Sequence, residues 1–242
     1  MTNDSERVYR GVSADQRRKQ RRAALIEAGL QLFGTEGYPN VPVKLICDEA
    51  GLTQRYFYES FSEREALLDA VYRYCVDEAR TGITTAALAY LAEIPEVMAG
   101  EPIPDEAMPG LADVTFGSFL HQLTFDPRRA RIIFIEVVGV SPALERLRIG
   151  AIHDWADLIL SFTAPNDRQS PERRLAAIGL VGAITQLLVD WQMAKVDPIT
   201  PESGPELFST EAIHRVITSM LVATYDHILR AGPTDPAPDA AV

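Results

Sequence analysis

The stretch AGLTQRYFYESFSEREALL, residues 50–68, decides how the rest of this 242-residue chain is interpreted. Gly51 ends a short apolar helix that we expect from Pro42 onward, and Thr53 is placed to cap the helix that follows. Phe57 and Phe61 lie four positions apart, so both belong to the inward face of that second helix. Two short helices joined by a tight glycine turn are typical of a helix-turn-helix, here residues 42–61.

The second helix of such a motif presents its first exposed side chains to base edges in the major groove of DNA. Gln54 has an amide that can bond adenine, and Arg55 has a guanidinium that can bond guanine. The flanking hydroxyl and cationic side chains are suited to phosphate contacts. The complete set of candidate DNA-contacting residues is Lys44, Thr53, Gln54, Arg55, Tyr56, Tyr58 and Arg64. The spacing alone leaves open that this is an exposed helix of a protein that does not bind DNA.

The surrounding sequence narrows this choice. Residues 50–68 follow ICDE at 46–49 and RAALIEAGLQLFGTEGY at 22–38, and together these segments resemble the signature of the TetR family of transcriptional regulators. The resemblance covers about a quarter of the chain, roughly residues 19–79. It implies an all-α fold, with an N-terminal three-helix helix-turn-helix domain and a larger C-terminal helical bundle that forms a homodimer.

The resemblance also assigns roles by position. It implies that the recognition helix is 53–60, that Gln54, Arg55 and Tyr56 read bases, and that Tyr58 and Lys44 contact the DNA backbone. Arg64 stands where a lysine is usual, which preserves the charge. The sequence departs from the pattern in two places. Val41 replaces a capping threonine or serine, and Glu59 with Ser60 replaces bulkier basic or aromatic residues.

Composition limits the partners and the chemistry. The net charge is −11, but residues 1–64 carry +1, so positive charge is concentrated locally around residues 7–22. The two cysteines lack paired spacing and the four histidines lack metal-ligand spacing, so we expect reduced buried thiols, no metal and no cofactor. No glycine-rich phosphate loop, GxSxG, CxxC or HExxH motif occurs, which argues against an enzyme. The charged start and the lack of a long uncharged stretch predict a cytoplasmic protein without a membrane span.

Four regions follow from this interpretation. They are a flexible basic arm at 1–18, the DNA-binding domain at 19–79, a ligand-binding and dimerisation domain at 80–231, and a disordered tail at 232–242. In the third region, helical periodicity predicts helices over 83–98, 111–123, 127–138, 142–162, 171–195 and 209–230. The segment 95–110, rich in proline and acidic residues, is expected to be a mobile or lid-like loop.

The larger domain is expected to hold the dimer interface and a cavity for a small-molecule inducer. Helix 171–195 is apolar on almost every side, and Gly179 and Gly182 would let a second subunit approach closely. Candidate ligand-binding residues on the middle helices are Phe116, Phe119, His121, Phe134, Trp155 and Trp191, with Glu136 and His153 as polar additions. The functional prediction is a regulator, commonly a repressor in this family, that a small, mainly apolar ligand releases from a palindromic double-stranded DNA operator. The alternative is a helical carrier or adaptor that has kept the fold without DNA binding.

Overall fold

The computed structural model describes residues 13–164, 170–194 and 208–230, and these residues form helices and turns with no strand. The chain divides into two compact units, Met1–Val71 and Tyr72–Val242. The all-α fold class is therefore confirmed. The division falls at Val71, eight residues before the boundary expected from the sequence. The predicted arm up to residue 12 and the predicted tail from residue 232 lie outside the described residues.

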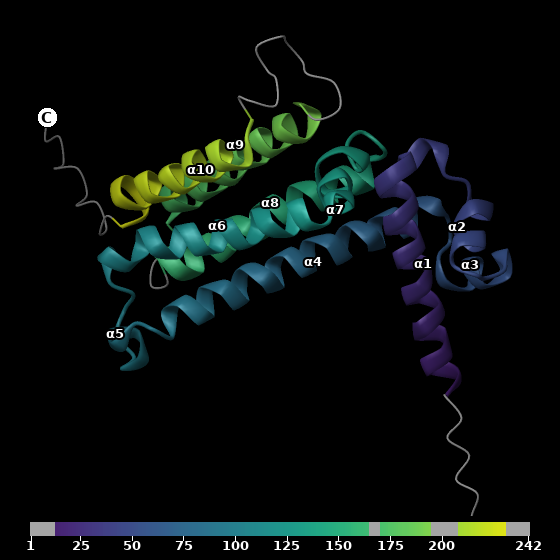
Figure 1. The fold of residues 1–242 in the computed structure, drawn as a ribbon, viewed down its shortest axis with the longest axis horizontal. Coiled ribbons are helices and arrows are strands. Elements are labelled where there is room, and N and C mark those ends of the chain that lie inside the picture. The colour runs from purple at the N-terminus through teal and green to yellow at the C-terminus, as the bar shows by residue number, and fades with distance from the viewer. Residues whose placement is uncertain (1–12, 165–169, 195–207, 231–242) are drawn as a thin grey trace, which may run out of the picture. The chain divides into compact units, whose positions relative to one another are not determined.

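The first unit is built from three helices and the beginning of a fourth. The helices are α1 (Ala14–Glu36), α2 (Val43–Glu49), α3 (Gln54–Ser60) and the start of α4 (Arg64–Leu91), with a 3-10 turn at Tyr38–Asn40 (Figure 1). Ser13 caps α1 by accepting a hydrogen bond from the backbone N–H of Gln16 at 3.0 Å. Residues 14–18 are therefore helical, and their assignment to a flexible arm was wrong.

Apolar side chains from all of these helices meet in one small core. Leu25 and Phe33 of α1, Ile46 of α2, Phe57 of α3 and Leu67 of α4 are all fully buried. The α2–α3 turn depends on the glycine that the sequence pointed to. Gly51 has φ +63, a left-handed conformation that costs other residues free energy.

The second unit is a bundle of long helices, several of which run side by side (Figure 1). Its elements after α4 are α5 (Pro95–Met98), α6 (Met108–Phe125), α7 (Pro127–Arg131), α8 (Pro142–Thr163), α9 (Pro171–Ala194) and α10 (Thr210–Thr224). A 3-10 turn at Asp105–Ala107 precedes α6, and π-helical turns at Ile132–Glu136 and Tyr225–Leu229 extend α7 and α10.

Two sequence expectations for this unit were wrong. Residues 83–91 do not start a new helix, because α4 continues without a break from Arg64 to Leu91. The segment 95–110 is not an open loop. It forms α5, a 3-10 turn and the start of α6, and it is fixed by hydrogen bonds from Tyr225 to Asp105 and from Tyr90 to the carbonyl of Ala107.

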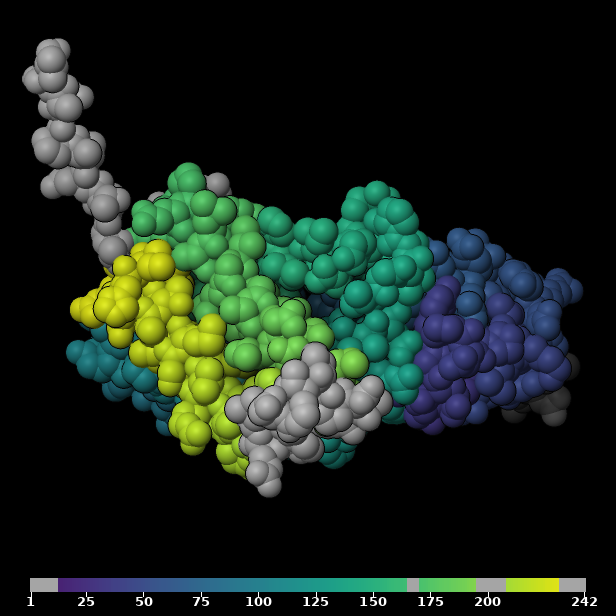
Figure 2. All heavy atoms as spheres, turned by 90° about the horizontal axis from the view of Figure 1, so that it is seen from above, coloured from purple at the N-terminus to yellow at the C-terminus, as the bar shows by residue number. Residues whose placement is uncertain are grey.

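Both cysteines, Cys47 and Cys75, are buried, as the sequence predicted, and neither forms a disulfide within the described part of the chain. Among the described residues, α9 is long and apolar enough to cross a membrane by length and composition alone, and 33% of its most apolar window is buried within the chain. α9 and α10 lie beside each other on one face of the second unit (Figure 2).

Candidate nucleic-acid interface and ligand cavity

One face of helix α3 packs against the core of the first unit, and the opposite face is exposed to solvent. Phe57 is fully buried and packs against the rings of Phe61 and Tyr58, with centroid distances of 5.9 and 5.3 Å. This anchor turns the other side of the helix outward, where Gln54 and Arg55 are exposed and Tyr58 is 57% exposed. Three of the predicted DNA-contacting side chains thus share one accessible surface, as base reading requires.

Glu59, which the sequence marked only as a departure from the family pattern, organises this surface. Its carboxylate accepts a hydrogen bond from Nε of Arg55 at 3.0 Å and lies 3.8 Å from Nη2 of Arg21 on α1. The guanidinium of Arg21 also lies 4.5 Å from the ring centroid of Tyr56. Glu59 therefore connects two arginines from different helices and limits the positions that Arg55 can adopt.

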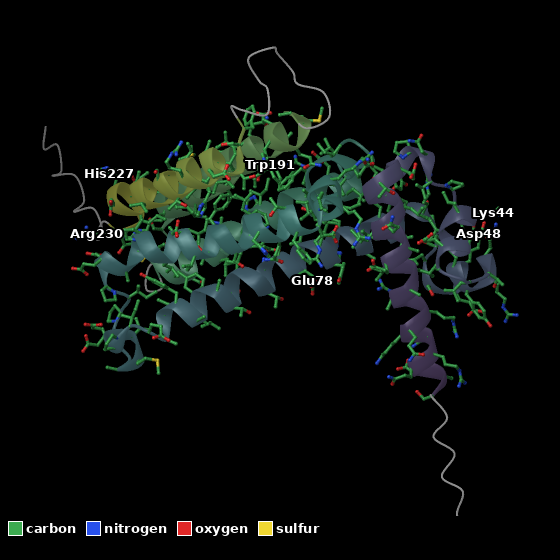
Figure 3. The ribbon with its side chains drawn as sticks, viewed as in Figure 1. Lys44, Asp48, Glu78, Trp191, His227 and Arg230 are labelled. Atoms are coloured by element: carbon green, nitrogen blue, oxygen red, sulfur yellow. The ribbon has the colours of Figure 1, made fainter. Side chains whose placement is uncertain are left out.

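Thr53 and Lys44 flank this surface. Thr53 occupies the N-cap position of α3, but its side chain makes no capping hydrogen bond, so that part of the expectation was wrong. Lys44 is highly exposed on α2, and its ammonium lies 2.6 Å from Asp48 one turn later (Figure 3). The hydrogen bond to Asp48 raises the pKa of Lys44 above its usual value, which keeps the side chain cationic.

Arg64 has a structural role that the sequence did not show. Its Nη1 donates to the backbone carbonyl of Val41 at 2.7 Å, and its guanidinium stacks 4.3 Å from the ring centroid of Tyr38. Val41 itself is fully buried. These contacts explain why a capping threonine or serine is not needed at position 41. Pro42 occupies the N-cap position of α2, while the side chain of Val41 fills the core and its carbonyl accepts the hydrogen bond from Arg64.

The second unit contains a cavity of about 200 Å³ between its helices. Its walls are almost entirely apolar and come from α4, α6, α8, α9, α10 and the two π-helical turns. On α8 the lining runs from Arg148 to Thr163, which corresponds to about 22 Å of helix at 1.5 Å per residue. The cavity therefore extends along the bundle.

Four of the six predicted ligand residues line this cavity. They are Phe116, Phe119, Phe134 and Trp155. The ring of Phe119 lies 6.2 Å from that of Phe116 and 5.9 Å from that of Trp155, so these aromatic residues form one continuous wall.

The remaining candidates lie elsewhere, so their assignment to the cavity wall was wrong. His121 is exposed and stacks on Phe125, because it points to the outer side of α6. Trp191 is 2% exposed and belongs to the apolar core behind the cavity. Of the two polar additions, Glu136 binds Arg131 at 2.7 Å, and neither Glu136 nor His153 lines the cavity.

Most polar groups in the cavity wall are already bonded within the protein. Thr115, Thr163 and Thr185 donate to carbonyls of their own helices, and Tyr225 donates to Asp105. Within the described ranges, no group of three or more histidine, cysteine, aspartate or glutamate side chains could hold a metal ion.

Comparison with known proteins identifies the first unit. The family model described as "Bacterial regulatory proteins, tetR family" matches residues 25–71, which run from the middle of α1 into α4 and include the whole of α2 and α3. No curated protein sequence matches the chain.

Solved structures of the same fold cover most of this chain. The fatty acid degradation regulator FadR of Bacillus halodurans is 16% identical, with a TM-score of 0.57 over 82% of this chain and 94% of its own. The transcriptional regulator FadR of Bacillus subtilis, solved in complex with stearoyl-CoA, is 13% identical, with a TM-score of 0.57 over 84% and 98%. A TetR/AcrR-family regulator of Thermobifida fusca is 20% identical, with a TM-score of 0.51 over 84% and 96%. At these identities the likeness establishes a common fold.

Proposed function

We propose that this chain, whose residues 25–71 match the tetR family model and whose fold is shared with TetR-family regulators, is a dimeric repressor that a small, mainly apolar ligand releases from a palindromic operator. The observation that carries this proposal is the outward face of α3. Gln54 and Arg55 stand at its start, above a buried Phe57 that fixes the helix. A short helix presented in this way is suited to a major groove.

The cavity of the second unit supports the ligand part of the proposal. An engineered cavity of about 150 Å³ with apolar walls binds benzene, so the volume of about 200 Å³ in this pocket is enough for a somewhat larger apolar molecule. Aromatic and aliphatic walls with few polar groups are typical of such ligand sites.

Helix α4 gives these two functions a common element. Leu67, Leu68 and Val71 in its first turns belong to the core of the first unit, while Val76 and Ile83 further along line the cavity. We propose that a ligand which binds two positions of α4 with different affinity changes the separation of the two α3 helices in a dimer. On an operator that separation should be about 34–36 Å, one turn of DNA.

A selection of bound fragments from genomic DNA, made with purified protein, tests this function. We expect enrichment of a near-palindromic site, with an affinity that falls steeply as salt concentration rises. Arg55→Ala and Tyr58→Ala should each weaken binding to that site without changing the oligomeric state. A protein that binds no duplex at low ionic strength would instead be the carrier or adaptor of the alternative hypothesis.

A further inference from the structure

Two polar residues of the cavity wall, Tyr72 and Arg148, keep hydrogen-bonding groups that no described residue satisfies. Tyr72 on α4 is 3% exposed and lines the cavity, and the structure records no hydrogen-bond partner for its hydroxyl among the described residues. Burial raises the pKa of Tyr72 to about 12, while the charge of Arg148 acts in the opposite direction, so the phenol is neutral and the guanidinium is nearby. A hydroxyl that borders the cavity without a protein partner is available to hydrogen-bond a ligand.

Arg148 provides a cation, and some N–H groups of its guanidinium are not used in hydrogen bonds. Glu145 accepts hydrogen bonds from its Nε, at 3.1 and 3.3 Å, and from its Nη2, at 2.8 Å. A guanidinium has five N–H donors in a fixed fork, so the edge formed by Nη1 has no partner in the described part of the chain. Arg148 is the first cavity-lining residue of α8, and the hydrogen bond to Glu145 raises its pKa further, which fixes its charge.

The charges of the cavity wall favour an anionic ligand over a cationic one. Among the described residues that line it, Arg148 is the one ionised side chain, and no aspartate or glutamate is present. The ion pair with Glu145 leaves the Nη1 edge of Arg148 available, so a carboxylate can bind that edge and the hydroxyl of Tyr72 together. A cationic ligand would find no anionic partner among the described residues of the cavity wall. Beyond these two residues, the wall up to Leu229 is made of apolar groups and hydroxyls that are already bonded.

We propose, on the premise that the cavity is the ligand site of the regulator, that its ligand is a medium-chain amphiphile that ends in a carboxylate. Tyr72 and Arg148 bind the carboxylate, and the hydrocarbon chain lies along the apolar length of the cavity towards Leu229. The cavity lining follows about 22 Å of α8, a length that an extended unbranched chain can occupy.

Calorimetric titration of the purified full-length protein tests this assignment. The probes are octanoate, decanoate and dodecanoate, each compared with the alcohol of the same chain length. We expect each acid that binds to bind about 10- to 100-fold more tightly than its alcohol, the range for a hydrogen bond to a charged group. Equal affinity of acid and alcohol, or no binding of any acid, overturns the assignment.

Three variants assign this preference to residues. Arg148→Gln should remove the acid preference, because the affinity for the acid falls much more than the affinity for the alcohol, and circular dichroism should report unchanged helix content. Tyr72→Phe should reduce the preference by a smaller factor, about 3- to 10-fold. Arg146→Gln is the matched control, since Arg146 is exposed on the same helix and does not line the cavity. An acid preference that survives in Arg148→Gln, or that is lost in Arg146→Gln, contradicts the proposal.

Operator binding by the same samples separates this inference from the proposed function. A protein that binds its operator but does not distinguish acid from alcohol remains a regulator with a different ligand. A protein that prefers acids through Arg148 but binds no DNA supports the ligand assignment and contradicts the regulatory function.

Discussion

Glu59 is an acidic residue on a surface that should approach phosphates, and its contacts with two arginines explain why an acid can stand there. By binding Arg55 and lying near Arg21, it fixes the direction of a guanidinium proposed to read a base. Glu59→Gln should therefore strengthen binding to random DNA, because one negative charge is lost, and reduce the ratio of specific to random affinity by roughly 10-fold. Fluorescence anisotropy with the selected operator and with a scrambled duplex measures both quantities.

Glu63→Gln provides the matched control for this prediction. Glu63 is also an exposed acid of the first unit, but its side chain takes no part in the arginine contacts. This variant should strengthen binding to random DNA to a similar degree and keep the specificity ratio. A ratio that falls equally in both variants would show that Glu59 acts through its charge alone.

Arg64 is predicted to contact phosphate, yet its hydrogen bond to the Val41 carbonyl and its stacking on Tyr38 make it part of the domain. Arg64→Ala should lower the free energy of unfolding by about 1–3 kcal/mol, the range for a hydrogen bond to a charged group. Arg64→Lys should recover only part of this loss, because an ammonium cannot stack in the same way. Urea unfolding measures the change. Arg55→Ala is the comparison, since its exposed side chain should leave stability within about 0.5 kcal/mol.

At the level of the elements, the turn between α2 and α3 depends on one backbone conformation. An added Cβ at Gly51 would meet no atom within 4 Å, so the cost of Gly51→Ala comes from its φ of +63 alone. We expect a loss of about 1–2 kcal/mol in unfolding free energy. Gly150→Ala on α8 also adds a Cβ in open space, but within a helix, and should stabilise the protein by about 0.5–1 kcal/mol. Thermal or urea unfolding of both variants should show opposite signs; equal signs would contradict the strain argument.

The helix boundaries that the sequence predicted well are those set by local chemistry. The glycine at 51 and the proline at 42 act through their own backbone conformations, so α2 and α3 could be placed in advance. Gly82 lies inside α4, directly before residue 83, where the sequence analysis expected a new helix to begin. A Cβ there would come within 2.2 Å of the Gln122 side chain, and Gly110 leaves room for Tyr90 in the same way. Close approach between distant helices leaves no local signal, so such a glycine looks like a break.

In the candidate sites, too, local sequence predicted some residues correctly, and others depended on the packing of distant helices. Periodicity placed Phe116, Phe119 and Trp155 on inward faces, and the structure brings them to one cavity. Periodicity could not separate a residue that faces the cavity from one that faces the core behind it, which is why Trp191 was included. Tyr72 and Arg148 were missed because they lie far apart in sequence on two helices, and only the packing of the bundle brings them together.

At the scale of the whole molecule, one face of α9 has no partner among the residues that the structure describes. Its exposed positions follow helical spacing and include Leu175, which is 70% exposed, and Gly179 and Gly182, which have open space around them. The neighbouring helix α10 exposes Val216 to 46%. An apolar helix with small residues at the centre of its exposed face is suited to close packing against a copy of itself. We propose that α9 and α10 form a four-helix bundle with the same helices of a second subunit.

Val216→Glu combined with Leu175→Glu should break this bundle, because each two-fold contact would then bury carboxylates of like charge without partners. Light scattering should report the mass of one chain in place of two, and circular dichroism should report unchanged helix content. Leu88→Glu is the matched control, because Leu88 is 60% exposed on α4, away from this face, and its variant should stay dimeric. Operator affinity should fall by several orders of magnitude in the monomer, because each half-site then binds without the other. A double variant that remains dimeric would place the subunit contact on another surface, and a wild-type protein that is monomeric would remove the basis for two recognition helices on one operator.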